Sequence, residues 1–246
     1  MTGVWADLAD LVLPAECAGC RVGRTALRHG VCVRCVTALQ LLRPTPVRPT
    51  PAPPGLPDCV ALGGYQGELR EALLSYKERG RHSLARPLGR LLAEVVAEAA
   101  GVIDPVPPAP PGGPRPVLLI PVPSTATAIR ARHGDHLRRL ARHTAHRLRA
   151  SGWPVTTASP LRALPRPDSA TLDSAGRAAA AGAAFTLRER RLLALRRAAT
   201  GRVVIVLDDI VTTGVTIAAV TGVLRSAGVR VNAAAVLAAT IRRAQW

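Results

Sequence analysis

The stretch "VVIVLDDIVTTGVT", residues 203–216, joins five apolar residues to two adjacent acids and a threonine-rich turn. A continuous apolar run of this kind is typical of a parallel strand that is buried on both faces. In an open parallel sheet, ligands bind beyond the carboxyl ends of the strands, and Asp208 and Asp209 are predicted to lie at such an end. The turn over 212–216 leads into a predicted helix over 215–227, whose free amides and dipole favour an anion.

The residue types of this turn predict a phosphate site. Gly214 lets the backbone approach a ligand closely, and Thr212, Thr213 and Thr216 add hydroxyl donors. Two carboxylates nearby would repel a bare phosphate, so they favour a ligand that also carries hydroxyls or a magnesium ion. A ribose 5-phosphate has both a phosphate and a cis-diol. A threonine cap or a solvated aspartate is an ordinary alternative for each residue alone, but the whole order is more specific.

Apolar strands alternate with helices along the rest of the chain. Strands are expected at 59–65, 117–122, 153–157, 203–207 and 231–240, and helices at 2–13, 68–78, 84–100, 135–150, 171–181 and 215–227. Such alternation indicates βαβ units, and hence an α/β fold with a mainly parallel sheet and helices on both faces. The segments 104–116 and 158–170 are expected to be loops.

A proline-rich segment, residues 43–57, is predicted to divide the chain. It is too rigid for a helix and has few amide donors for a sheet. The expected organisation is therefore an amino-terminal helix with a cysteine module over 1–42, a linker over 43–57 and the α/β domain over 58–246.

Four cysteines follow the pattern C-x2-C-x11-C-x2-C: Cys17, Cys20, Cys32 and Cys35. Each pair can bind one metal ion, and a hairpin between the pairs would bring four thiolates into a tetrahedron. The pattern predicts a structural zinc site in a zinc-ribbon-like module, with disulfides, a redox pair and an iron–sulfur cluster as alternatives. Cys59 lies beyond the linker and is expected to be a small core residue.

The chain is strongly basic, with a formal net charge of +17, and Lys77 is its single lysine among 33 basic residues. This balance permits binding to polyanions, although a GC-rich coding bias gives the same composition. Aromatic residues make up only 2%, which disfavours direct stacking on single-stranded DNA. No apolar run reaches the length of a membrane span, and the start has no basic flank, so we expect a cytoplasmic protein without membrane insertion.

The 203–216 motif resembles the ribose-phosphate signature of the type I phosphoribosyltransferases. The resemblance implies that Asp208 and Asp209 address the ribose hydroxyls and magnesium, acting in catalysis, while Thr212, Thr213, Gly214, Val215 and Thr216 surround the 5-phosphate. Such enzymes displace pyrophosphate from phosphoribosyl pyrophosphate through a cationic state.

Most of the chain is similar to the ComF family, whose members join a four-cysteine zinc module to a phosphoribosyltransferase domain. The similarity rests on the cysteine pairs, on the 203–216 motif, and on "YQGELREALLSYKERG", "IPVPST", "RARHGDH" and "DSATLDSAGRAAAAGAAF", which begin at residues 65, 120, 130 and 168. It implies a pyrophosphate loop with Pro123, Ser124, Thr125, Arg130 and Arg132. Lys77 is interpreted either as a contact to an anionic ligand or as a helix-end charge.

The sequence departs from the family pattern at Ser169, Ala180 and His133, which casts doubt on base transfer more than on ribose-phosphate binding. His133, His136, His143 and His146 are interpreted as part of a solvated basic face. Three functions stay open: a magnesium-dependent phosphoribosyltransferase, a nucleotide sensor without turnover, and an accessory protein of DNA uptake that acts through a helicase-like partner or on single-stranded DNA.

Overall fold

The computed structural model describes residues 16–23, 25–102, 113–165 and 184–240. The helices expected at 2–13 and 171–181 lie outside these ranges, as do Ser169 and Ala180 and most of the expected loop over 104–116. Among the described residues, no helix is both long and apolar enough to cross a bilayer.

A six-stranded, mostly parallel sheet forms the centre of the molecule, in the order β3-β4-β10-β9-β5-β6. The parallel strands are β4 (Asp58–Gly64), β10 (Ala233–Ala239), β9 (Val203–Val211), β5 (Val117–Pro121) and β6 (Val155–Thr157). All residues of β5 and β10 are buried, which explains their continuous aliphatic sequence. The α/β class expected from the alternation of strands and helices is therefore confirmed.

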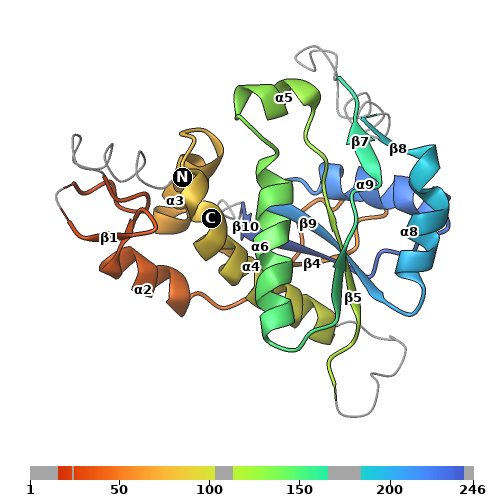
Figure 1. Cartoon of the computed structure of the whole chain (residues 1–246), viewed down its shortest axis with the longest axis horizontal. Helices are drawn as coiled ribbons and strands as arrows, with labels where there is room; N and C mark the ends of the chain where they lie inside the picture. The colour runs from red at the N-terminus through yellow and green to blue at the C-terminus, as the bar shows by residue number, and fades with distance from the viewer. Residues whose placement is uncertain (1–15, 24, 103–112, 166–183, 241–246) are drawn as a thin grey trace, which may run out of the picture.

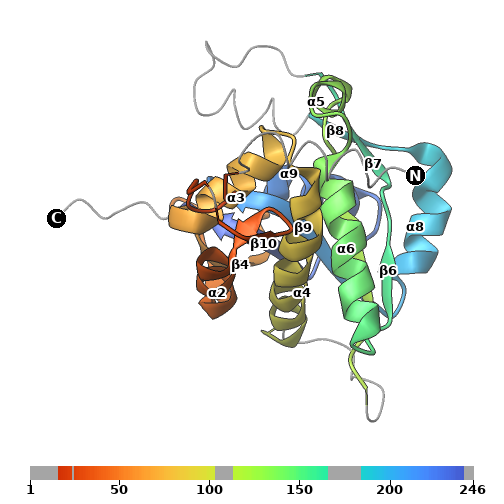
Figure 2. The ribbon, with the colours of Figure 1, turned by 60° about the vertical axis from the view of Figure 1, so that its left-hand side comes forward.

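Helices cover the sheet. On one face, α4 (Ala85–Val102) and α6 (His136–Ala150) lie side by side (Figures 1 and 2), near α3 (Gly67–Lys77). The connections β4-to-β5 and β5-to-β6 run one way along the sheet, whereas β9-to-β10 through α9 (Val215–Ser226) runs the other way. Because such crossovers are right-handed, α9 covers the opposite face (Figure 1).

Shorter elements complete the fold. A hairpin of β1 (Leu27–Arg28) and β2 (Val31–Cys32) precedes α2 (Val33–Leu41), and α5 (Ala126–Ala131) follows β5. β7 (Leu161–Ala163) pairs with β8 (Phe185–Leu187), followed by α8 (Leu192–Ala199). The 3-10 turns within the described ranges are η1 (His82–Leu84) and η3 (Glu189–Arg191). α2, α5, β8 and α8 were not expected from the sequence, and the expectation of a loop over residues 161–163 was wrong.

The linker contains a strand that the sequence analysis excluded. β3 (Thr45–Val47) pairs antiparallel with β4, and Pro46 lies opposite Val60 at the edge of the sheet. An edge strand needs ladder hydrogen bonds on one side only, so a proline whose missing amide would face outward is tolerated there. The expectation that 43–57 cannot join a sheet was therefore wrong.

Candidate functional site

The topology places two sequence-predicted loops next to each other. β5 and β9 are neighbours, and the helices that follow them cover opposite faces. This point is where the strand order reverses, and open α/β sheets bind ligands at the carboxyl ends of such strand pairs. The backbone amide of Val122, just after β5, donates to the Leu207 carbonyl of β9 at 2.9 Å. The segments 123–132 and 212–216 therefore leave the sheet from adjacent strands.

The turn after β9 has a backbone conformation and a packing that require glycine. Gly214 caps α9 in the left-handed conformation, with φ at 76°, and it supplies no capping side chain to the first-turn amides. A Cβ atom at this position would lie 3.0 Å from the side chain of Leu56, so the site needs glycine for both conformation and space. Thr212 and Thr213 are exposed, and Thr216 is half-buried. The turn is therefore open to solvent although Gly214 itself is buried.

Asp208 and Asp209 lie inside β9, three and two residues before its end, rather than beyond the strand. Successive side chains of a strand point to opposite faces, so the two carboxylates have different surroundings. Asp208 is half-buried, and its Oδ1 accepts the Asp209 amide at 2.9 Å. Burial, and then the charge of Asp209, raise the pKa of Asp208 well above its usual range.

Asp209 is buried, and one of its carboxylate oxygens contacts the side chains of both Lys77 and His136. Its Oδ2 lies 2.8 Å from Nζ of Lys77, at the end of α3, and 3.2 Å from Nε2 of His136, at the start of α6. Burial alone would raise the pKa of Asp209, but the hydrogen bond to His136 and the charge of Lys77 outweigh it and lower the pKa. The anion that Lys77 contacts here is thus Asp209.

His136 does not belong to a solvated basic face, and this part of the sequence interpretation was wrong. Its side chain is only 7% exposed because the start of α6 packs against β9 and α3. The hydroxyl of the buried Tyr76 donates to the His136 carbonyl at 2.6 Å, and Nδ1 of His136 has no hydrogen-bond partner among the described residues. Farther along α6, His146 and the arginines at 138, 142, 147 and 149 are exposed.

The segment after β5 carries both free and engaged groups. Pro123, Ser124 and Thr125 are half-buried, and Oγ1 of Thr125 accepts the Ala128 amide at 3.2 Å to cap α5. Because that hydroxyl accepts from the backbone, its own proton stays available for a ligand. Arg130 is exposed.

Arg132 ties this segment to α3. Its Nη2 lies 3.1 Å from a carboxylate oxygen of Glu78, the residue that follows Lys77. The end of α3 therefore meets both β9, through Lys77, and the segment after β5, through Glu78. Sequence reasoning missed the roles of His136 and Glu78, and no local pattern around either residue signals them.

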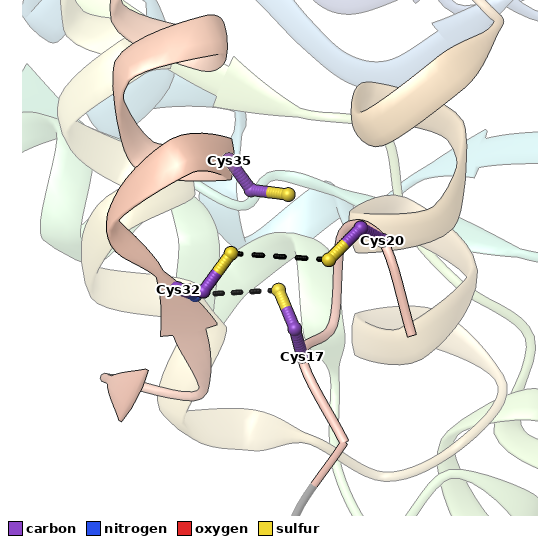
Figure 3. Close-up of side chains that lie close together, drawn as sticks. All are labelled: Cys17, Cys20, Cys32 and Cys35. Atoms are coloured by element: carbon purple, nitrogen blue, oxygen red, sulfur yellow. Dashed lines mark hydrogen bonds between the residues drawn. The ribbon is translucent and has the colours of Figure 1, made fainter. Parts of the chain in front are cut away.

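The four predicted cysteine ligands form one cluster (Figure 3). Their sulfur atoms all lie within 4.8 Å of one another, and Sγ of Cys20 is 3.8 Å from Sγ of Cys32. Thiolates around a tetrahedral zinc ion lie about 3.8 Å apart, since each Zn–S bond is about 2.3 Å long. The hairpin of β1 and β2 separates the pairs, as expected. The cluster can hold a metal ion, and no disulfide joins these residues.

The surroundings favour the thiolate of Cys17, whereas burial raises the pKa of Cys35. The amides of Gly19 and Cys32 donate to Sγ of Cys17 at 3.4 and 3.2 Å. Burial opposes the charge of Cys17, but these backbone hydrogen bonds outweigh it and lower its pKa to about 6. A Cβ atom on Gly19 would lie 2.9 Å from Sγ of Cys35, so a glycine is needed to leave room for that sulfur atom.

The cysteine module packs on α3. Oγ of Ser75 donates to the Ala18 carbonyl at 3.2 Å, and the Arg81 guanidinium donates to the Glu16 carbonyl. Cys59 lies apart in β4, buried, with its thiol donating to the Pro57 carbonyl at 3.3 Å. Burial raises the pKa of Cys59 to about 12, which fits its predicted place in the core.

Models of known protein families and curated proteins give no match to the chain.

Proposed function

We propose that this chain binds a ribose 5-phosphate ligand, such as phosphoribosyl pyrophosphate, together with magnesium, on a type I phosphoribosyltransferase fold. The observation that carries the proposal is the departure of both loops, 123–132 and 212–216, from adjacent strands where the strand order reverses. Phosphate groups at both ends of one sugar would match two anion-binding loops on either side of a carboxylate.

Each loop has a distinct role in this proposal. The amides of the first turn of α9 and the hydroxyls of Thr212, Thr213 and Thr216 bind the 5-phosphate. Ser124 and Thr125, with the charge of Arg130, bind the pyrophosphate. Arg132 contacts Glu78 through Nη2 in this structure, and its guanidinium has further N–H donors for the ligand.

The two aspartates have different roles in this proposal. Asp208 contacts the ribose hydroxyls and would hold magnesium, because its half-buried carboxylate has a raised pKa that a nearby cation would lower. Asp209 positions Lys77 and His136 beside the ligand, since both already occupy its Oδ2. Magnesium, when bound, screens the charge of the pyrophosphate.

The ComF resemblance supports a structural zinc ion held by Cys17, Cys20, Cys32 and Cys35. Thiolate ligands at tetrahedral spacing prefer zinc, and four protein ligands leave no open position for catalysis. The fit rests on the cluster geometry and on the amides that favour charged sulfur. The zinc ion therefore stabilises the module and takes no part in the chemistry.

The cellular role proposed from the same resemblance is cytoplasmic, in DNA uptake or nucleotide metabolism. Enzymatic turnover would form a bond between C1 of the ribose and an acceptor, and pyrophosphate would leave. A second candidate is an accessory role in DNA handling through a helicase-like partner. The exposed arginines at 138, 142, 147 and 149 of α6 favour it, because several exposed cations on one helix match a polyanion or an acidic surface.

Calorimetric titration with phosphoribosyl pyrophosphate, with and without magnesium, tests the proposed function. We expect saturable binding that magnesium tightens, and a loss of affinity of at least tenfold in Asp208→Asn, because a charge-assisted contact contributes about 1.5–3 kcal/mol. Arg142→Gln on exposed α6 is the control and should bind normally. Absence of binding, or binding unaffected by Asp208→Asn, contradicts the proposal.

Assays of pyrophosphate release and of DNA binding separate the three candidate functions. Release of pyrophosphate across a panel of bases and amines identifies an enzyme, and tight binding without release identifies a sensor. Binding to single-stranded DNA that weakens steeply with salt, and that Arg142→Gln reduces, identifies direct DNA contact through α6.

A further inference from the structure

A cleft lies between the cysteine module and the first half of α4, away from the proposed ligand site. Figures 1 and 2 place α2 and α4 as neighbours. The floor of the cleft is apolar, built from the buried Val31, Leu39 and Leu91 with the half-buried Val36 and Pro87. An apolar floor of this kind is suited to the apolar side of an amphipathic helix.

The rim of the cleft carries more basic than acidic side chains. Arg28, Arg86 and Arg90 are exposed there, against one acid, Glu94. In the ranges that the structure describes, none of these three arginines has an ion-pair partner. An occupant that matches the cleft therefore carries apolar side chains flanked by acids.

The amino-terminal stretch of this chain has that composition. Residues 1–16 contain Asp7, Asp10 and Glu16 and no arginine or lysine, in a chain with a net charge of +17. On a helix, Val4, Trp5, Leu8, Leu11 and Val12 share one side, since they follow the i, i+3, i+4, i+7 spacing. Asp7 lies at the edge of that apolar side, where it can meet an arginine of the rim.

The carboxyl end of this stretch, at Glu16, lies near the wall of the cleft. Glu16 is held by Arg81, and the amide of Ala18 donates to the Gly30 carbonyl at 2.9 Å, one residue from His29 in the wall of the cleft. The four steps from Glu16 to Val12 span up to about 14 Å. A connection of this length is available to carry the apolar residues of the stretch from Glu16 toward the cleft.

We propose that residues 4–12 dock as an amphipathic helix into this cleft of the same molecule. The docked helix covers the apolar floor, neutralises the arginines and fastens the cysteine module to α4. This contact is independent of the proposed ribose-phosphate site.

Hydrogen–deuterium exchange of the full chain tests the docking, with Arg86→Glu/Arg90→Glu compared with the wild type. In the wild type, we expect amides of 5–13 to exchange at least tenfold more slowly than an unstructured peptide, and the double variant should remove most of this protection. The control, Arg138→Glu/Arg142→Glu, reverses two charges at the same spacing on exposed α6 and should leave it intact. Restored protection on adding Asp7→Arg/Asp10→Arg to Arg86→Glu/Arg90→Glu excludes a general loss of folding.

Three results would overturn the proposal. The first is unprotected exchange of 5–13 in the wild type, and the second is protection that Arg86→Glu/Arg90→Glu does not change. The third is protection of 5–13 that increases with protein concentration, combined with a dimeric mass measured by light scattering. This result would show that the cleft binds the amino-terminal stretch of a second copy.

Discussion

The ammonium nitrogen of Lys77 lies 2.8 Å from Oδ2 of Asp209, which pairs the single lysine of the chain with its most deeply placed acid at the candidate site. His136 shares the same oxygen at 3.2 Å. The contact joins the end of α3 to β9, so it holds together two elements that border the strand-order reversal. A buried carboxylate that loses its cation is left uncompensated, which makes this pair open to direct tests.

Lys77→Ala should destabilise the fold by about 2 kcal/mol. This is less than the roughly 3–5 kcal/mol of a fully buried pair, because a quarter of the Lys77 side chain is exposed. Urea unfolding followed by circular dichroism measures the change. Arg70→Ala breaks an exposed ion pair with Glu71 and should cost below about 1 kcal/mol. Equal losses in the two variants would show that the Lys77–Asp209 contact contributes nothing beyond a surface pair.

Asp208→Asn should raise the thermal stability at pH 7 while it weakens ligand binding. The pKa of Asp208 is raised by folding, so the folded state binds more protons than the unfolded state between the two pKa values, and stability falls as the pH rises through that window. The gain of the variant should therefore vanish below about pH 4, the usual pKa of an unfolded aspartate. Melting temperatures from pH 3 to 8 measure it, and a variant less stable than the wild type at pH 7 would contradict the reasoning.

Asp209 should behave in the opposite way. Its pKa is lowered in the folded state, so its contribution to stability is present above the unfolded pKa of about 3.9 and is lost as the pH falls through the folded value. Asp209→Asn should destabilise the fold at pH 7, and the deficit should shrink toward acid pH. The same melting series compares it with Asp208→Asn. A deficit that does not change with pH would assign the loss to packing rather than to charge.

Gly19→Ala should weaken zinc binding by about tenfold or more, as disturbed surroundings of metal ligands commonly do. The added methyl group would meet Sγ of Cys35 at 2.9 Å, and the sulfur atom would have to move. Competition with a chromogenic chelator measures the affinity. Gly23→Ala is the matched control, because a Cβ atom there meets nothing within 4 Å. If both variants keep the wild-type affinity, the close approach of Gly19 to Cys35 is not needed for the site.

Gly214→Ala should abolish ligand binding and destabilise the fold. The alanine would be forced to a φ of 76° and its methyl group would meet Leu56 at 3.0 Å, which would shift the turn that presents the first amides of α9. Gly201→Ala, at a φ of 68° with open space around it, should cost only the left-handed strain, of order 1 kcal/mol, and should bind normally. Calorimetry with phosphoribosyl pyrophosphate compares the two, and normal binding by Gly214→Ala would remove the turn from the site.

Much of the architecture follows from local sequence. The apolar runs at 117–122 and 203–207 and the regular helical spacing of 135–150 predicted β5, β9 and α6, because burial on two faces or on one stripe leaves a periodic signature. The cysteine spacing likewise predicted the cluster. The edge strand β3 and the short helices escaped prediction, whereas the other edge strand, β6, was expected. Pro46 reads as a strand breaker until the sheet edge is known, and α5 is six residues long.

The sequence by itself determined which residue types stand at the candidate site: an acid pair, a threonine-glycine turn, a serine-threonine loop and one lysine. Only the tertiary structure decided the burial and the contact partners of each of these residues. It buried Asp209 against Lys77 and His136 and left Asp208 half-buried, because neighbouring side chains of a strand point to opposite faces, and each face is covered by helices from distant parts of the chain. Burial and partner charge set the properties of a carboxylate, and both depend on contacts that no local pattern encodes.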